Sequence, residues 1–191
     1  MAQAVKGSLV EYRPEELEET RRKVVERGLS PCHAFFACIL ASLAEINALN
    51  QAVANFMAKK AAPKIHKYLT AMGKLHVTGN TPVERLESLV KQLNEALEIS
   101  PEAVVKTEPD GTILVGIGGG RRCRYCPKGV GEAQIPGTAC PFPRLIEHLA
   151  RLEGIDLELV IQRVNGHFEE VRREDKLCWI KYRIRGFREA S

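Results

Sequence analysis

The chain has 191 residues, of which 45% are apolar and 27% charged, and its 28 basic and 24 acidic side chains give a net charge of +4. This composition excludes wholesale disorder, because it supplies enough apolar surface for a core. The longest near-apolar run, residues 34–49, is interrupted by Glu45 and Asn47 and is too short to cross a bilayer. No N-terminal signal pattern is found either, so we expect a cytoplasmic protein.

The chain begins with a loose arm over residues 1–13 and then turns helical. Pro14 opens a charged segment in which acidic residues come first and basic residues last, an order that suits the helix dipole. Gly28 ends this segment. Ser30 and the proline after it are an N-cap and a first-turn proline for a second helix, over about 31–50.

The helix over 31–50 is apolar on nearly all sides, which is typical of a helix buried in a fold or in a dimer. Its cysteines, Cys32 and Cys38, are interpreted as small buried hydrophobic residues. Small residues recur at spacings of three or four, which permits close helix approach, and they are Ala34, Ala37, Ala41 and Ala44. We therefore predict a homodimer through helix 31–50.

Two further helices complete the N-terminal part. One covers about 51–72 and is expected to kink or restart at Pro63. The other begins at a capping box, Thr81–Glu84, and runs to about residue 97 with its leucines on one face. Residues 14–100 are thus predicted to be the helical part of the molecule.

After residue 100 the hydrophobic period changes from that of helices to that of strands. Strands over 104–108 and 112–117 flank a Pro-Asp-Gly turn and predict a β-hairpin. A helix over about 141–153 then precedes strands over about 155–164 and 177–185. We predict an α+β fold, in which the N-terminal helices pack on a four-stranded antiparallel sheet made of two hairpins joined by a helix. Residues 101–191 form this α/β part, and 14–191 make one domain.

Four of the six cysteines, Cys123, Cys126, Cys140 and Cys178, lie in the α/β part. Clustered cysteines in a chain without an export signal favour metal or redox chemistry over disulfides. The helix that begins at Cys140 runs for about 20 Å, and the next strand must return along it. The last strand pairs with that strand, so Cys178 should start at the end of the domain where Cys140 lies. The four thiols can therefore converge on one zinc ion.

Alternatives to a four-cysteine zinc site remain open. Four thiols also suffice for an iron–sulfur cluster, and a CxxC pair such as Cys123 and Cys126 is compatible with a redox or disulfide role. His167, in the connection between the last two strands, is an alternative to Cys178 as the fourth ligand. Because the chain lacks the second CxxC pair of a zinc ribbon, the ligand set rests on the predicted topology.

Three segments, Gly137–Ile146, Leu157–Val164 and Asp175–Ile184, resemble the 4-vinyl reductase domain over about residues 31–185, most clearly over 113–185. The resemblance implies the NO-signalling and Golgi-transport fold and the binding of a hydrocarbon or another small apolar molecule. That family, found in archaea and bacteria, typically carries a cysteine before the helix and one opening the last strand, here Cys140 and Cys178. Its middle cysteine is absent, and residues 165–167 stand in its place.

Other patterns are weighed against function. Basic residues surround the CxxC and mark the last strands, and they are Arg121, Arg122, Arg124, Lys128, Arg172, Arg173, Lys181, Arg183, Arg185 and Arg188. They permit nucleic-acid binding, but a solvated face that supports thiolates is favoured, because Tyr125 is the only aromatic residue among the basic residues of the loop. The glycine-rich run, with Gly116, Gly118, Gly119 and Gly120, lacks the Gly-Lys-Ser/Thr ending of a phosphate-binding loop.

No serine, histidine and carboxylate arrangement points to nucleophilic catalysis, and the histidines His33, His66, His76 and His148 are interpreted as surface or packing residues. Our hypothesis is a zinc-stabilised domain that binds or senses a small apolar molecule, with a pocket near Phe142. The alternatives are a basic module for nucleic acid or protein interaction and a cysteine redox or iron–sulfur protein. No residue identifies an enzyme.

Overall fold

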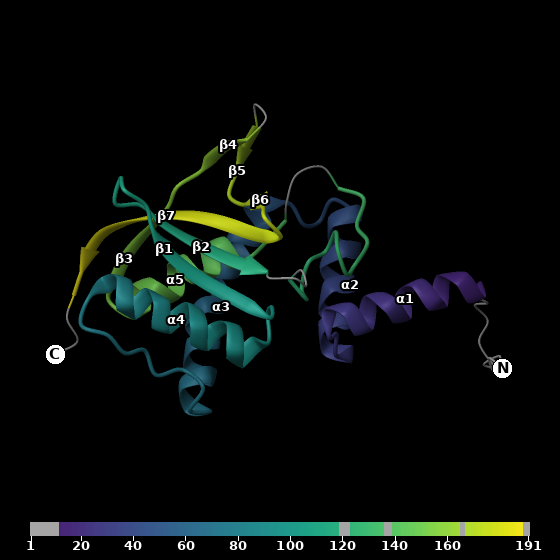
Figure 1. The fold of residues 1–191 in the computed structure, drawn as a ribbon, viewed down its shortest axis with the longest axis horizontal. Coiled ribbons are helices and arrows are strands. Elements are labelled where there is room, and N and C mark those ends of the chain that lie inside the picture. Colours follow the sequence, from purple (N-terminus) through teal and green to yellow (C-terminus); the bar gives the residue numbers. More distant parts are fainter. Residues whose placement is uncertain (1–11, 119–122, 136–138, 165–166, 189–191) are drawn as a thin grey trace.

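The computed structural model describes residues 12–118, 123–135, 139–164 and 167–188. Its N-terminal part is helical and contains α1 Pro14–Arg27, α2 Pro31–Glu45, α3 Gln51–Ala71 and α4 Pro82–Leu97. Its C-terminal part contains β1 Glu102–Thr107, β2 Ile113–Gly118, α5 Phe142–Leu152, β3 Ile155–Leu159, β4 Gln162–Val164, β5 His167–Glu169, β6 Arg172–Glu174 and β7 Leu177–Phe187. The predicted α+β class is confirmed (Figure 1).

The main sheet is antiparallel, but within the described residues it has five strands instead of the predicted four. The strand expected over 155–164 ends at Leu159, and β4 and β5 form a separate hairpin that projects from the sheet (Figure 1). The chain then rejoins the same edge of β7 as β6. The eleven-residue β7 is longer than β3, so one edge of β7 accommodates both β3 and β6.

Helix boundaries follow the local signals in the sequence. The Ser30 hydroxyl accepts a hydrogen bond from the backbone N–H of His33, and the Thr81 hydroxyl accepts one from the backbone N–H of Glu84. Gly28 closes α1 in the left-handed conformation. The restart expected at Pro63 is wrong, because α3 is one helix of 21 residues that contains this proline. Packing of its buried face against α5 supports this continuous helix.

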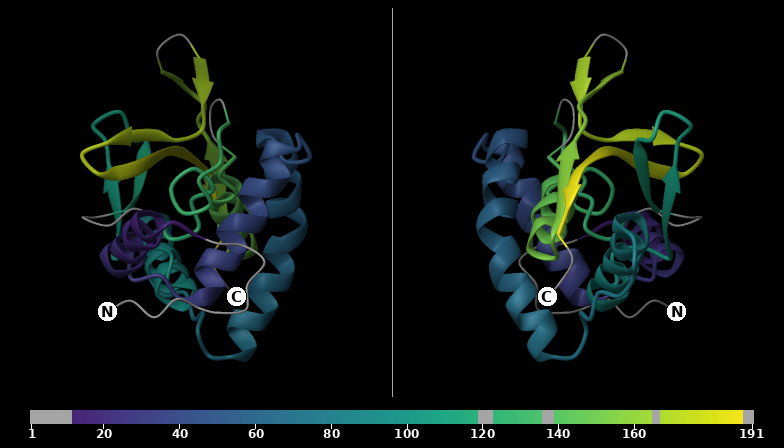
Figure 2. Two further views of the ribbon diagram at one scale, coloured as in Figure 1. Left: turned by 90° about the vertical axis from the view of Figure 1, so that its right-hand side faces the viewer. Right: turned by 90° about the vertical axis from the view of Figure 1, so that its left-hand side faces the viewer.

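One apolar core joins the two parts of the chain. Leucines on the inner face of α4 pack against the inward residues of β2 and β7 and against α5. Figure 2 shows α3, α4 and α5 on the same side of the sheet, opposite the β4–β5 hairpin. The largest fully buried side chain is Tyr182, whose hydroxyl donates to the Pro143 carbonyl over 2.7 Å. The sheet and α5 are therefore fixed to each other beside the start of α5.

Helices α1 and α2 are attached differently from the rest. In Figure 1, α1 extends away from the sheet, and none of its residues is buried. Among the described residues, no single helix is both long enough and apolar enough to span a membrane. Only α1 and α2 taken together meet those requirements, and a bend of 113° separates them.

Gly116 provides a test of the sheet. A Cβ atom at this position would lie 2.6 Å from the ring of Trp179. The Lys106 ammonium lies 5.0 Å from the centre of the same ring. We predict that Gly116→Ala lowers the free energy of unfolding by about 1–3 kcal/mol. Trp179 is the only tryptophan in the chain, so its fluorescence during urea unfolding reports this change directly.

Gly186→Ala is the matched control for this prediction. Gly186 lies in β7, the strand that contains Trp179, and a Cβ atom at this position would make only an ordinary contact with Asp156 at 3.8 Å. Its stability should stay within about 0.5 kcal/mol of the wild type. Equal stability of the two variants would contradict the packing of Trp179 on Gly116.

Candidate functional site

A cavity of about 290 Å³ lies at the end of the sheet where β2 ends and β7 begins. Its walls are Ile117, Cys123, Tyr125, Cys126, Pro127, Lys128, Ala139, Cys140, Pro141, Phe142, Glu169, Val171, Arg173, Cys178 and Ile180. Most of these side chains are apolar. The cavity is thus an apolar chamber that also contains thiols and three charged groups.

All four predicted ligand residues line this one cavity. Cys123 and Cys126 come from the loop that follows β2, and Cys140 lies two residues before the start of α5. Cys178 is brought in by the antiparallel pairing of β2 with β7, where it stands opposite Ile117. The structure therefore places the four cysteines together, as the predicted topology required.

Burial governs the ionisation of these thiols. It raises the pKa of Cys123 to about 12 and the pKa of Cys140 well above its usual range, although part of the Cys140 residue reaches solvent. The neighbouring cysteines add to both shifts. The redox alternative stays a prediction, because a CxxC pair needs a lowered pKa at only one of its two thiols.

The thiols do not form a ready-made metal centre. Across the described residues, no three His, Cys, Asp or Glu side chains are arranged so that they could hold a metal ion as they stand. Metal binding here would require loss of the thiol protons and a closer approach of the sulfur atoms.

Tyr125 and Arg124, inside the CxxC, anchor the cysteine loop, which we define as residues 123–135. The Tyr125 hydroxyl donates to the Leu97 carbonyl at the end of α4 over 2.7 Å. The Arg124 guanidinium donates to the carbonyls of Arg27 and Glu98, at 2.9 and 2.7 Å. The two residues between the cysteines therefore bind the loop to the ends of α1 and α4.

The cysteine loop also packs closely against α2. A Cβ atom on Gly131 would lie 2.4 Å from the Ala37 carbonyl oxygen and 2.6 Å from the Ala41 Cβ atom, so only glycine permits this approach. The Tyr125 ring makes edge contacts with His33 and Phe36, at centroid distances of 5.0 and 5.6 Å. The loop is thus the main support of α2.

A buried polar network holds the opposite wall of the cavity. The Gln51 amide donates to the Cys140 carbonyl over 3.1 Å and to the Glu170 carboxylate over 2.9 Å. Glu170 also accepts from Asn55 and from Arg144. These contacts fix Cys140 to α3 and to the chain between β5 and β6. The sequence analysis missed this network, because isolated Gln, Asn and Glu residues carry no recognisable spacing.

Cys32 and Cys38 are exposed, so their interpretation as buried hydrophobic residues is wrong. The reason is that α2 buries one side only, which contacts the cysteine loop through Ala37 and Ala41 and a small apolar cluster through Leu40 and Ala44. His167 opens β5, in the hairpin that projects from the sheet, and its side chain lies outside the described part of the structure. Its role as an alternative ligand stays a prediction.

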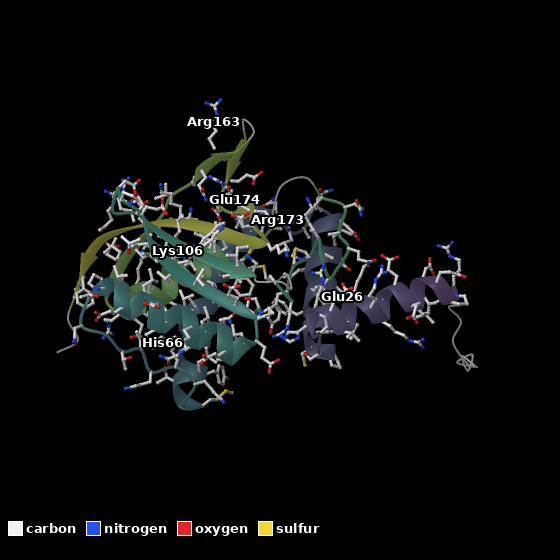
Figure 3. All side chains as sticks on the ribbon, viewed as in Figure 1. Glu26, His66, Lys106, Arg163, Arg173 and Glu174 are labelled. Atoms are coloured by element: carbon white, nitrogen blue, oxygen red, sulfur yellow. The ribbon has the colours of Figure 1, made fainter. Side chains whose placement is uncertain are left out.

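Several residues of the predicted basic face are occupied elsewhere. Arg124 is bound to backbone carbonyls, and three others pair with carboxylates, in the pairs Arg172–Glu174, Lys181–Asp110 and Arg185–Glu158. Arg121 and Arg122 lie outside the described residues. Figure 3 shows Arg173 at the end of the sheet nearest α2, where it lines the cavity with Lys128. Within the described part of the chain, four residues of the predicted basic face therefore have partners of their own.

His33 links the support of α2 to pH. It is 2% exposed, and its Nδ1 accepts the Ser30 backbone N–H over 3.0 Å, which requires a neutral ring with the proton on Nε2. Burial, aided by Arg124, lowers its pKa below the ordinary value of 6.5, while Glu98 opposes that shift. His33 therefore takes up a proton near pH 6.5 in the unfolded chain, but only at lower pH in the folded chain.

We predict that the free energy of unfolding falls as the pH drops from about 7 to about 5, with a slope of up to about 1.4 kcal/mol per pH unit from this residue. His33→Gln should show a shallower slope in urea unfolding over this range. The slope should not vanish, because burial lowers the pKa of His148 as well. An unchanged slope in His33→Gln would contradict the neutral state of this ring.

Comparisons with known proteins place the chain in a family. A model of the MJ0207 family matches residues 47–184. The "Uncharacterized protein MJ1342" of Methanocaldococcus jannaschii is 37% identical over 60 residues, which are 31% of this chain and 51% of that protein. The chain thus spans about half the length of this relative.

No solved structure matches the chain. These matches do not bear on the resemblance to the 4-vinyl reductase domain, which stays a prediction together with the NO-signalling fold. The family segment begins after α2 and contains the cavity and its four cysteines. Because it covers most of the 191 residues, the chain belongs to the MJ0207 family.

Proposed function

We propose that this protein is a metal-binding domain in which Cys123, Cys126, Cys140 and Cys178 take up one soft metal ion, zinc foremost, inside the cavity. The observation that carries the proposal is that four cysteines from distant parts of the chain line one cavity of about 290 Å³. Four thiolates fill the tetrahedral coordination of zinc and leave no open position, so the ion is structural and no catalysis is proposed.

The charges around the cavity suit a four-thiolate centre. Zinc with four thiolates carries a net charge of −2, which is costly in an apolar chamber unless cations lie nearby. Lys128 and Arg173 line the cavity, and Arg27 acts electrostatically on the Cys123 thiol and favours its ionised form. These three cations would offset the charge of the bound centre, although the Glu169 carboxylate, which also lines the cavity, acts against them.

An ion held by these residues would join three pieces of the fold. Cys123 and Cys126 belong to the cysteine loop, Cys140 precedes α5 and Cys178 lies in β7. The cysteine loop has no strand or helix of its own and is held by a few contacts to the ends of α1 and α4 and to α2. An ion that cross-links it to β7 would stabilise the folded state, because the ion binds the assembled ligands of the folded chain more tightly than those of the unfolded chain.

The same cavity supports a second candidate function, the binding of a small apolar molecule. Its lining includes the apolar side chains of Ile117, Phe142, Val171 and Ile180. A volume of about 290 Å³ is close to the lower end of the range for small-molecule pockets, about 300 Å³. This candidate agrees with the ligand class implied by the resemblance to the 4-vinyl reductase domain.

Elemental analysis tests the metal proposal. Native protein should contain one metal ion per chain, and Cys→Ser at each of the four cavity cysteines should weaken metal affinity by more than about 100-fold, since even indirect contacts to a metal ligand contribute 10- to 100-fold. Cys32→Ser and Cys38→Ser, on the exposed side of α2, are the matched controls and should retain the metal.

Two outcomes would count against this ligand set. Equal metal loss in the control variants would mean that binding is not specific to the cavity. Full metal retention in Cys178→Ser would show that Cys178 is not the fourth ligand. Loss of the metal in His167→Ala would then identify His167 as that ligand.

Native mass spectrometry tests the second candidate. Protein purified without detergent should carry a non-covalent apolar adduct, and Val171→Trp should displace it by filling a wall of the cavity while leaving the metal in place. Val171 is 6% exposed and belongs to the core, so the circular dichroism spectrum of the Val171→Trp variant must match that of the wild type. Absence of any adduct, together with no binding of apolar fluorescent probes, would reject this function.

A further inference from the structure

The outer side of α2 exposes large apolar side chains in a single row. Phe35 is 70% exposed, Ile39 is 45% exposed and Ile46, just after the helix, is 71% exposed. These positions are spaced by four and seven residues, so they lie above one another on the same side of the helix. Phe36, 45% exposed, flanks the row, and we call these four residues the α2 stripe.

The α2 stripe cannot be buried by a rotation of α2 within the chain. The opposite side of α2 is fixed by the close approach of Gly131 to Ala37 and Ala41 and by a small cluster that joins Leu40 to Ala139. The small residues predicted to permit approach of a partner helix are therefore mostly used within the chain itself. Any partner must meet α2 on the side of the aromatic residues.

The size of the α2 stripe points to an interface. Since a phenylalanine side chain has on the order of 200 Å² of surface, the four residues together expose roughly 400 Å². Patches of this size on a soluble protein are typically functional. Buried on both partners and surrounded by a polar rim, such a patch would form the centre of an interface of standard size.

Charge favours a second copy of this chain as the partner. Between Pro31 and Glu45 the only charged side chain is Glu45 itself, so two α2 helices can approach without like-charge repulsion. The helices on either side differ in charge, because α3 is basic and the first half of α1 is acidic, whereas the second half of α1 is mainly basic. The first half of α1 contains Glu15, Glu16, Glu18 and Glu19, whereas α3 contains no acidic residue and exposes Lys59, Lys60, Lys64 and Lys67.

In a two-fold pairing through α2, the acidic half of α1 can face the lysines of the other copy's α3. Glu16, Glu18 and Glu19 already pair with basic residues of their own segment, so they would exchange or share those partners. Such a contact would also account for α1 itself. This helix has 14 residues, none of them buried, and a helix of that length is marginal in water without tertiary contacts.

We infer that the α2 stripe is a self-association surface, on which the same stripe of a second copy packs. The surface lies outside the segment that the family model matches, which starts at residue 47. Dimerisation would therefore be a property that α1 and α2 add to the family domain. The inference does not depend on metal binding, because it rests on exposed side chains of α2 and on the charges of its neighbours.

Light scattering coupled to size-exclusion chromatography tests the inference on the full chain. The wild type should be a dimer, and Phe35→Glu/Ile39→Glu should raise the dissociation constant at least about 100-fold, because each copy would then bring two charges into the centre of the contact. Ile161→Glu is the matched control. Ile161 is 51% exposed and lies between β3 and β4, so this variant should remain a dimer.

The milder variant Ile39→Ala guards against a folding defect in the double variant, and it should weaken the dimer measurably with unchanged circular dichroism and metal content. A monomeric wild type at all concentrations would overturn the inference, as would a dimer that withstands both sets of α2 changes. Binding of the monomer to vesicles of anionic phospholipid, lost in Phe35→Glu/Ile39→Glu, would also overturn it and would identify the surface as a lipid contact.

Discussion

The antiparallel pairing of β2 with β7 is the constraint on which the candidate site depends. It sets Cys178 opposite Ile117 at the end of the sheet from which the cysteine loop departs. The start of α5 is held at the same end by the hydrogen bond from Tyr182 to the Pro143 carbonyl, so Cys140 has little freedom to lie elsewhere. The four cysteines line one cavity because these contacts bring their segments to the same end of the sheet, and the proposed metal binding rests on that proximity.

The cysteine loop also connects the site to the N-terminal helices. Tyr125 and Arg124 bind the ends of α4 and α1, and Gly131 packs closely against the backbone of α2. A centre formed by the cavity cysteines would therefore stabilise the support of α2, and with it the orientation of the α2 stripe. Site and surface are separate proposals, yet the same short segment of chain carries the contacts of both.

The sequence predicts those features that local chemistry decides. The caps at Ser30 and Thr81, the class of the fold and the meeting of Cys140 with Cys178 all follow from residue types, helix length and strand direction. The pairing of both β3 and β6 with one edge of β7 cannot be predicted in this way, because it depends on contacts between distant segments. The exposure of Cys32 has the same origin, since only the placement of the cysteine loop decides which side of α2 is covered.

X-ray absorption spectroscopy at the edge of the bound metal tests the central claim most directly, because it counts the ligands of the ion in the intact protein. The account predicts a single shell of four sulfur atoms at about 2.3 Å from zinc. A shell dominated by nitrogen or oxygen, or native protein without a stoichiometric metal, would contradict the assignment of Cys123, Cys126, Cys140 and Cys178 as the ligand set.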